Sequence, residues 1–169
     1  MKTSKYNICQ DWSYNDGNLK GKILMVHFRL AFLLRSHILF TVIGLPFLIY
    51  YRIFIEWVMG VELQMTTQVG TGCRLEHGQG LVVYSMTVIG SGALLRQNVT
   101  IGNKKNKDGS YSDAPIIGNN CDLGAGAMLI GEITIGDNVT VGAGCVVVKD
   151  VPSNSIVIGN PMRIIPKKL

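Results

Sequence analysis

The sequence lacks the features of several common protein classes. None of its four cysteines forms a CxxC pair, so a zinc site of that type is not expected. Lysine and arginine occur without a long basic block, which argues against a nucleic-acid-binding protein. Disordered chains combine low hydrophobicity with high charge, whereas 47% of these residues are apolar and 16% are charged. We therefore expect one folded domain with a real core from the 169 residues.

Long apolar segments are also missing. Residues 1–20 are polar where a secretory signal peptide would need an apolar stretch. Residues 36–51 carry no formal charge, but they number only 16 and are broken by Gly44 and Pro46. A membrane-spanning helix needs roughly 20 apolar residues. We expect an intracellular, cytoplasmic protein with reduced cysteines.

The formal net charge of +5 is unevenly distributed. Acidic residues slightly outnumber basic ones between positions 61 and 160, so the basic excess comes from the N-terminal region and from Arg163, Lys167 and Lys168. A small phosphorylated ligand or an anionic membrane surface fits this distribution at least as well as a nucleic acid.

The N-terminal region, residues 1–60, is predicted to contain helices. Within residues 22–35, apolar residues recur at the three- and four-residue intervals of a helix: Ile23, Val26, Leu30, Leu33 and Leu34. Gly44 and Pro46 interrupt this pattern, and a second helix is predicted from about 46 to 59.

Two interpretations of these apolar helices remain open. They pack on the rest of the protein or on a partner subunit, which we favour. Alternatively, residues 22–59 make a peripheral membrane contact that is helped by Arg29, Arg35 and Arg52.

From residue 61 onward, aliphatic residues recur every six positions, apart from a two-residue insertion before Ile89 and a longer insertion before Ile117. The series comprises Leu63, Val69, Leu75, Leu81, Ile89, Leu95, Ile101, Ile117, Leu123, Leu129, Ile135, Val141 and Val147. Each hexapeptide supplies a short strand and a turn, and three hexapeptides complete a triangular coil. Stacked coils then bury a continuous core, which predicts a parallel β-helix over residues 61–152.

Three cysteines fall at the other inward position of the hexapeptide: Cys73, Cys121 and Cys145. A thiol there acts as a small buried apolar group, whereas a cysteine nucleophile must be exposed and activated. The register therefore argues against an acyl-cysteine intermediate on these three residues.

Two departures from the regular repeat are candidates for a functional site. Residues 103–113 carry no aliphatic anchor and are predicted to leave the prism as a loop. This loop is either a solvated excursion or a cleft wall, possibly against a neighbouring subunit, that holds Lys104, Lys105 and Lys107 near phosphate.

His77 is the second departure, as the only histidine in the repeat region. Its register predicts an outward-facing side chain. With a reference pKa of about 6.5, an imidazole suits proton removal from an alcohol. The alternative is an ordinary surface histidine.

Several motifs resemble those of the hexapeptide-repeat acyltransferases of the serine acetyltransferase type, and more closely the colanic-acid and capsular-polysaccharide O-acetyltransferases. The motifs are Leu75-Glu76-His77-Gly78, Val99-Thr100-Ile101-Gly102, Gly124-Ala125-Gly126, Gly142-Ala143-Gly144, and Val151-Pro152 followed by Gly159-Asn160-Pro161. The fold class implied is all-β, a left-handed parallel β-helix with a short N-terminal α-helical region and a C-terminal segment at 153–169.

The resemblance implies an acetyl-CoA-dependent O-acetyltransferase without a metal. Its active sites would lie between subunits of a homotrimer, and His77 would act as the general base. Small residues at Gly102, Ala125 and Ala143 match positions along the pantetheine arm, and Asn103 and Lys104 follow directly. On charge and location, Lys149 and Arg163 are our candidates for the CoA phosphates.

Acidic residues extend the expected site. Glu62 matches the carboxylate that pairs with the family histidine, although it is one methylene longer than the family's aspartate. Glu76 matches a residue that helps to bind the acceptor. Serine acetyltransferases carry Arg-His-Pro after the loop, whereas this chain has Asp113-Ala114-Pro115, and Asp113 would repel a carboxylate. A sugar hydroxyl of a surface or capsular polysaccharide or its precursor is therefore the preferred acceptor.

Alternative functions remain at this point. Serine O-acetylation and antibiotic acetylation use the same fold, and a non-catalytic β-helix binding module is a further possibility. A γ-type carbonic anhydrase is excluded because it needs several histidines on zinc and the repeats hold one.

Overall fold

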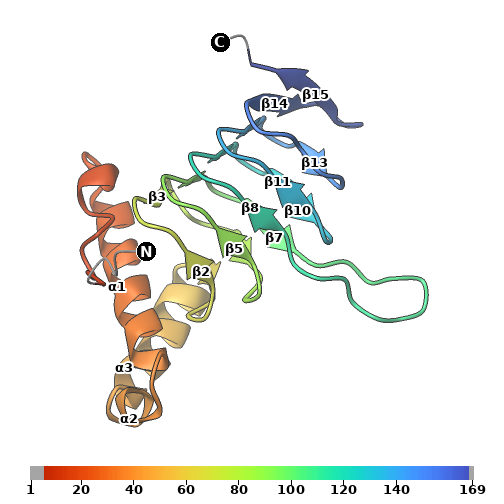
Figure 1. The fold of residues 1–169 in the computed structure, drawn as a ribbon. Coiled ribbons are helices and arrows are strands. Elements are labelled where there is room, and N and C mark those ends of the chain that lie inside the picture. Colours follow the sequence, from red (N-terminus) through yellow and green to blue (C-terminus); the bar gives the residue numbers. More distant parts are fainter. Residues whose placement is uncertain (1–5, 168–169) are drawn as a thin grey trace.

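The computed structural model describes residues 6–167, so Lys168 and its predicted charge contribution lie outside the described residues. A bundle of helices covers one end of a triangular β-helix, and the described chain ends at the opposite end (Figure 1). The prediction of a left-handed parallel β-helix with a short N-terminal helical region is confirmed, with about five coils.

The N-terminal region forms five short elements. A 3-10 turn, η1, spans Ser13–Asn15, and three α-helices follow: α1 at Leu19–Arg35, α2 at Ile38–Ile43 and α3 at Leu45–Tyr50. A π-helical segment, η2, then runs over Tyr51–Val58. Both predicted helices are present, although α2 is an additional helix between them. In the part of the chain that the structure describes, no helix is both long and apolar enough to cross a membrane.

The buried face of α1 differs from the one that its apolar spacing suggested. Leu24, Met25 and Phe28 are buried, whereas Ile23 is exposed. Arg29 is also buried, because its guanidinium lies between Asp11 and the backbone of the first coil. Its position rules out the predicted contribution of Arg29 to a membrane contact.

Three parallel sheets form the faces of the prism, and each coil contributes one strand to each sheet. Sheet A contains β1 (Val61–Leu63), β4 (Leu81–Val83), β7 (Thr100–Gly102), β10 (Met128–Ile130) and β13 (Val146–Val147). Sheet B contains β2 (Gln68–Val69), β5 (Val88–Ile89), β8 (Ile116–Ile117) and β11 (Thr134–Ile135). Sheet C contains β3 (Arg74–Leu75), β6 (Leu94–Leu95), β9 (Asp122–Leu123), β12 (Thr140–Val141), β14 (Ser155–Ile158) and the antiparallel β15 (Arg163–Pro166).

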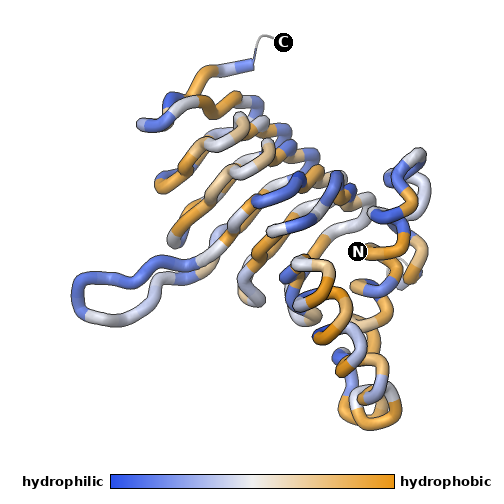
Figure 2. Tube along the Cα trace, turned by 180° about the vertical axis from the view of Figure 1, so that it is seen from behind, coloured by the Kyte–Doolittle hydropathy of each residue, from blue (hydrophilic) through white to orange (hydrophobic). Residues whose placement is uncertain are grey.

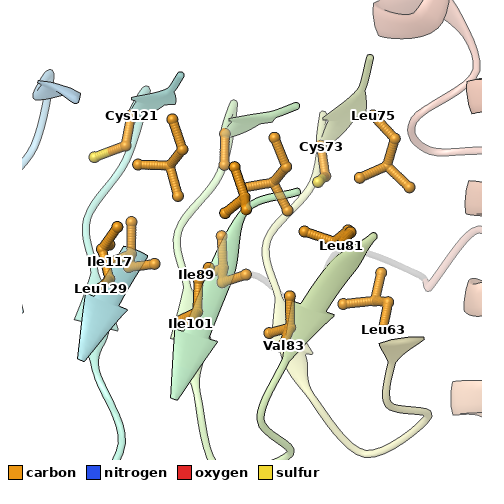
Figure 3. Packing of buried hydrophobic residues seen from close by; sticks show 14 of the residues in the cluster. Leu63, Cys73, Leu75, Leu81, Val83, Ile89, Ile101, Ile117, Cys121 and Leu129 are labelled. Atoms are coloured by element: carbon orange, nitrogen blue, oxygen red, sulfur yellow. The ribbon is translucent and has the colours of Figure 1, made fainter. Parts of the chain in front are cut away.

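The interior of the prism is a stack of aliphatic side chains with thiols among them (Figure 3). Cys73, Cys121 and Cys145 are all buried, as the register predicted. Burial raises the pKa of the Cys73 thiol to about 12, and it also raises the pKa values of Cys121 and Cys145. These thiols are therefore core residues that remain protonated near neutral pH.

Polar side chains from the N-terminal region cover the open strand edges of the first coil. Directly before β3, Asp11 accepts from the Cys73 N–H at 2.9 Å, and the Asn15 side chain donates to the Cys73 carbonyl at 2.9 Å. On β2, Arg29 donates to the Val69 carbonyl at 2.6 Å. On β1, the Tyr51 hydroxyl donates to the Leu63 carbonyl at 2.7 Å. The helical region thus caps the β-helix, satisfying backbone groups that would otherwise be unpaired.

Candidate functional site

His77 lies in the turn that leads from β3 of the first coil to β4 of the second. Its backbone has a φ of 66°, and Gly78 and Gly80 beside it also have positive φ values. The Gly80 N–H donates to the Gly60 carbonyl at 2.7 Å, which holds this turn against the start of β1. The His77 side chain is exposed, as predicted from its register.

Within residues 6–167, His77 differs in residue type from the other non-glycine residues that have a left-handed backbone. There, the other non-glycine residues with positive φ are all asparagines: Asn98, Asn120, Asn138 and Asn154. Asparagine and histidine are both enriched among the non-glycine residues that adopt this conformation, so the fold accepts either residue here. The exposed imidazole, and not the backbone conformation, makes His77 a candidate for chemistry.

Equivalent turns of successive coils stack on the His77 turn and form one edge of the prism between sheets C and A. We call the turns at 77–80, 97–98, 125–126 and 143–144 the histidine edge. Backbone hydrogen bonds of 2.9 Å join each turn to the next: Asn98 N–H to Gln79, Gly126 N–H to Gln97, and Gly144 N–H to Ala125. His77 therefore shares an edge with Ala125 and Ala143, two of the predicted donor-binding residues.

Spacing along this edge follows from the strand spacing. Adjacent coils lie about 4.8 Å apart, so the turn of His77 and that of Ala143 are separated by about 14 Å. Between them lies Gln97, whose buried Oε1 has no hydrogen-bond partner among the described residues. Sequence reasoning did not identify Gln97, because a single glutamine in a repeat carries no distinctive signal.

Glu62 lies on β1, at the same end of the prism as His77, with its side chain exposed on the outer face of sheet A. The hydrogen bond between Gly80 and Gly60 sets the His77 turn next to the strand that carries Glu62. The buried Glu56 of η2 is close enough for the charge of Glu62 to raise its pKa, although burial is the largest cause and Arg52 opposes it.

Glu76 is part of an ion-pair ladder on sheet C. Its two oxygens lie 2.7 Å from Arg74 Nη2 and 3.2 Å from Arg96 Nε, and Arg96 also pairs with Asp122. Neither arginine was recognised from the sequence as a partner of Glu76, and Arg96 and Asp122 come from later coils. Glu76 is predicted to bind an acceptor hydroxyl. Both of its carboxylate oxygens already form ion pairs with arginines, so one of them would have to bind the hydroxyl as well.

The segment at 103–113 leaves the prism as a projecting hairpin, which confirms the predicted loop (Figure 1). An antiparallel bridge joins Lys105 to Tyr111, and the Ser112 N–H donates to the Lys104 carbonyl at 2.9 Å. Asp113 is exposed at its base. The hairpin is therefore an ordered projection on the edge between sheets A and B, which we call the loop edge.

The remaining predicted residues divide between the two edges. Gly102, at the end of β7 on the loop edge, has open space where a Cβ would lie, and Asn103 follows it half-buried. Lys104 extends its alkyl chain over Gly131 of the next coil. Lys149 is exposed further along the loop edge. Arg163 begins β15, opposite Ile158, at the far end of sheet C.

The two edges thus border sheet A on opposite sides. The histidine edge holds His77, Ala125 and Ala143, and the loop edge holds Gly102 and Lys104. Within one chain they are separated by the width of sheet A. No cluster of three His, Cys, Asp or Glu side chains suited to a metal ion occurs in residues 6–167.

Comparisons with known proteins find the same repeat and fold. The family model of the bacterial transferase hexapeptide (six repeats) matches residues 114–149. The Escherichia coli (strain K12) protein WcaB, named for an acetyltransferase of colanic acid biosynthesis, is 33% identical over 92% of this chain and 96% of its own length. The serine acetyltransferase of Synechococcus elongatus is 41% identical over 63% of this chain and 43% of that protein.

Solved structures agree with this. The soybean serine acetyltransferase apoenzyme superimposes with a TM-score of 0.74 at 32% identity, over 88% of this chain and 58% of that chain. This chain therefore spans about half the length of the serine acetyltransferases that it matches and nearly all of WcaB.

Proposed function

This chain belongs to the hexapeptide-repeat acetyltransferases, and from that membership we propose that it transfers an acetyl group from acetyl-CoA to a hydroxyl group of a glycan. The observation that carries the proposal is the exposed His77, which has a left-handed backbone and stands at one end of an edge of small residues.

In the proposed reaction, His77 accepts the proton of the acceptor hydroxyl as its oxygen attacks the thioester carbonyl carbon. The tetrahedral intermediate collapses, the C–S bond breaks, and the imidazolium returns its proton to the CoA thiolate. No covalent enzyme intermediate forms, in agreement with the burial of Cys73, Cys121 and Cys145. Glu62 is the proposed carboxylate that orients the imidazole and stabilises its charged form.

The histidine edge is the proposed track of the donor. Ala125 and Ala143 are small and leave room for the pantetheine arm. The edge spans about 14 Å from the His77 turn to that of Ala143, which suits an extended ligand. Beyond this end, Arg163 is a candidate for a phosphate contact.

Gly102, Asn103, Lys104 and Lys149 lie on the other side of sheet A, so they fit the same site only through a second copy. We propose a homotrimer in which the loop edge of one subunit faces the histidine edge of its neighbour. The projecting hairpin would then form a wall of the shared cleft. Asp113 at its base would contact the acceptor, and Glu76 is the second proposed acceptor residue.

Two observations favour a glycan over serine as the acceptor. Asp113 stands where serine acetyltransferases have an arginine, so this chain lacks a cation to receive the amino-acid carboxylate. WcaB also matches over nearly its full length. Serine O-acetylation is the second candidate, because serine acetyltransferases show comparable identity.

The test is an acceptor screen with labelled acetyl-CoA against nucleotide sugars, oligosaccharides, lipid-linked glycans and free serine. We expect acetyl transfer to a saccharide and none to serine. Rapid turnover with serine alone would overturn the acceptor assignment. If acetyl-CoA is neither bound nor hydrolysed, the chain is a non-catalytic binding module instead.

The proposal places the enzyme in the cytoplasm, at the inner face of a membrane. It rests on the exposed apolar surface of the helical region, within residues 22–59.

A further inference from the structure

A cleft of about 590 Å³ lies between the helical region and the first turn of the loop edge. Its helical wall includes Arg35, Ile49, Arg52, Ile53 and Trp57. The opposite wall begins at Gln64, directly after β1, so the cleft opens beside the strand that carries Glu62. This volume falls within the usual range for a small-molecule site, roughly 300–1,000 Å³.

The walls of the cleft are mainly apolar and open to the outside. Ile49 is 51% exposed, Ile53 is 48% exposed and Trp57 is 71% exposed. The apolar surface continues over α2, none of whose residues is buried. Figure 2 shows this hydrophobic helical region at one end of the molecule, away from the polar hairpin. An apolar chain that enters the cleft can therefore extend along a larger apolar surface.

Two guanidinium groups line the same cleft. Arg35 is exposed and makes no ion pair within residues 6–167. Arg52 is 59% exposed and lies 3.5 Å from Glu56. The sequence contains no aspartate or glutamate from position 17 to position 55. The cleft thus combines the guanidinium of Arg35, which has no ion pair among residues 6–167, and the exposed, partly paired guanidinium of Arg52 with an apolar wall.

We propose that this cleft binds an amphiphile that carries a phosphate group on an alkyl or isoprenyl chain. Arg35 and Arg52 bind the phosphate, and Ile49, Ile53 and Trp57 contact the chain. Guanidinium forms strong charge-assisted hydrogen bonds with phosphate, and tryptophan suits the boundary between an apolar and a polar layer. The role of the cleft as an acceptor site depends on the proposed glycan acetylation. Binding of the amphiphile does not depend on it.

A second copy of the chain is a poorer occupant. A symmetric contact through this helical unit would bring Arg35 and Arg52 of two copies together, and among residues 6–167 Glu56 is the one carboxylate paired with either of them. The charge of the cleft therefore favours an anionic ligand.

Binding is measured on the full chain without acetyl-CoA, so that it is independent of catalysis. Trp57 becomes the only indole in a Trp12→Phe background, and its emission reports occupancy. The probes are decyl phosphate below its micelle-forming concentration, decanol and inorganic phosphate. We expect decyl phosphate to bind at least tenfold more tightly than either of the other two, because only it uses both features of the cleft.

Arginine substitutions localise the site. Arg35→Gln and Arg52→Gln should each weaken decyl phosphate binding roughly tenfold or more, as expected for a lost charge-assisted hydrogen bond. Lys20→Gln is the matched control, because it removes the same charge from the other end of α1, about 22 Å from Arg35. Thermal denaturation verifies that each variant is folded.

Vesicles then identify the source of the phosphate. Phosphatidylcholine vesicles are compared with the same vesicles containing either phosphatidylglycerol or polyisoprenyl phosphate. Equal binding to both anionic preparations assigns the site to bilayer lipids, and preference for polyisoprenyl phosphate assigns it to lipid-linked intermediates.

Three results would overturn the proposal. The first is that decyl phosphate binds no better than inorganic phosphate, and the second is that Lys20→Gln weakens its binding as much as Arg35→Gln does. The third is that Trp57 emission depends on protein concentration and Trp57→Gln dissociates the assembly, which would show that a second copy covers the cleft. If the chain binds decyl phosphate but acetylates no acceptor in the screen, the proposed acetyl transfer is wrong and the proposed ligand of the cleft is unaffected.

Discussion

At the scale of single residues, the backbone of His77 determines how its role can be tested. Its φ of 66° strains an alanine, whereas the other corners of the prism hold asparagine in the same conformation. His77→Asn therefore removes the imidazole with little change to the turn, which makes it a cleaner variant than His77→Ala.

We expect His77→Asn to lower kcat by about 10²–10⁴-fold, the usual contribution of general base catalysis. The KM for acetyl-CoA should change little, because the rest of the histidine edge is intact. Steady-state kinetics with the acceptor found in the screen measure both constants. His37→Asn, which removes an exposed imidazole at the start of α2, is the control and should retain activity. An unchanged kcat in His77→Asn contradicts the proposed mechanism.

Glu56 gives a prediction about pH and stability. Burial raises the pKa of its carboxyl above the usual value of about 4.3, so the unfolded state releases this proton at lower pH than the folded state. Its contribution to stability is therefore complete below about pH 4.3 and decreases as pH rises towards the raised pKa. Glu56→Gln should abolish that decrease.

Urea denaturation across this pH range measures the effect. The variant Glu56→Gln should have a higher unfolding free energy than the parent, and this difference should grow with pH. The control is Glu132→Gln, which replaces an exposed carboxylate and should show no such trend. A constant difference at all pH values would mean that Glu56 titrates normally in the folded protein.

At the scale of elements, the first coil is held by buried polar contacts from α1 and the segment before it. Arg29 and Asp11 are 2% and 1% exposed, and their nitrogen and oxygen atoms lie 2.7 Å apart. Arg29 also donates to the carbonyls of Val69 and Gly70, both at 2.6 Å. One side chain thereby joins α1, the N-terminal segment and the end of sheet B.

Arg29→Met should destabilise the protein by about 3–5 kcal/mol, because it leaves the Asp11 charge buried without a partner. The double variant Arg29→Met/Asp11→Asn should recover part of this loss, since the amide oxygen can still accept from Cys73. Chemical denaturation measures both changes. Lys22→Met, which breaks an exposed ion pair on the same helix, should have little effect. Similar losses for both single variants would refute the anchoring role of Arg29.

At the scale of the whole molecule, the separation of the two edges leads to a test of subunit sharing. If His77 of one subunit works with the hairpin of its neighbour, two inactive variants can complement one another. The hairpin can be removed without loss of core, because residues 104–111 are all exposed.

We expect His77→Asn and a variant with residues 104–111 replaced by a short glycine linker each to lose at least about tenfold in activity. Mixing and reassembling the two should restore part of it, because some interfaces then pair an intact histidine edge with an intact hairpin. Acetyl transfer is compared before and after mixing. Absence of recovery, although mass measurements show mixed assemblies, would place the complete site within one chain.

The hexapeptide pattern was enough to predict the β-helix, its inward cysteines and the projecting loop. The reason is that each coil repeats the same local pattern, so that the position of a residue in the hexapeptide sets its burial. The helices were also predictable, but the buried face of α1 was not. Arg29 has the sequence signature of a surface residue, and only its contact with Asp11 allows it to be buried.

Only the tertiary structure decided how the candidate residues are grouped. Stacking of coils placed His77, Gln97, Ala125 and Ala143 on one edge, although they are far apart in the chain. Stacking also enclosed Glu76 between arginines of two coils and set Gly102 across sheet A from His77. Periodicity fixes the orientation of each residue within its coil, but contacts between coils and with the helical cap depend on insertions and on long-range packing.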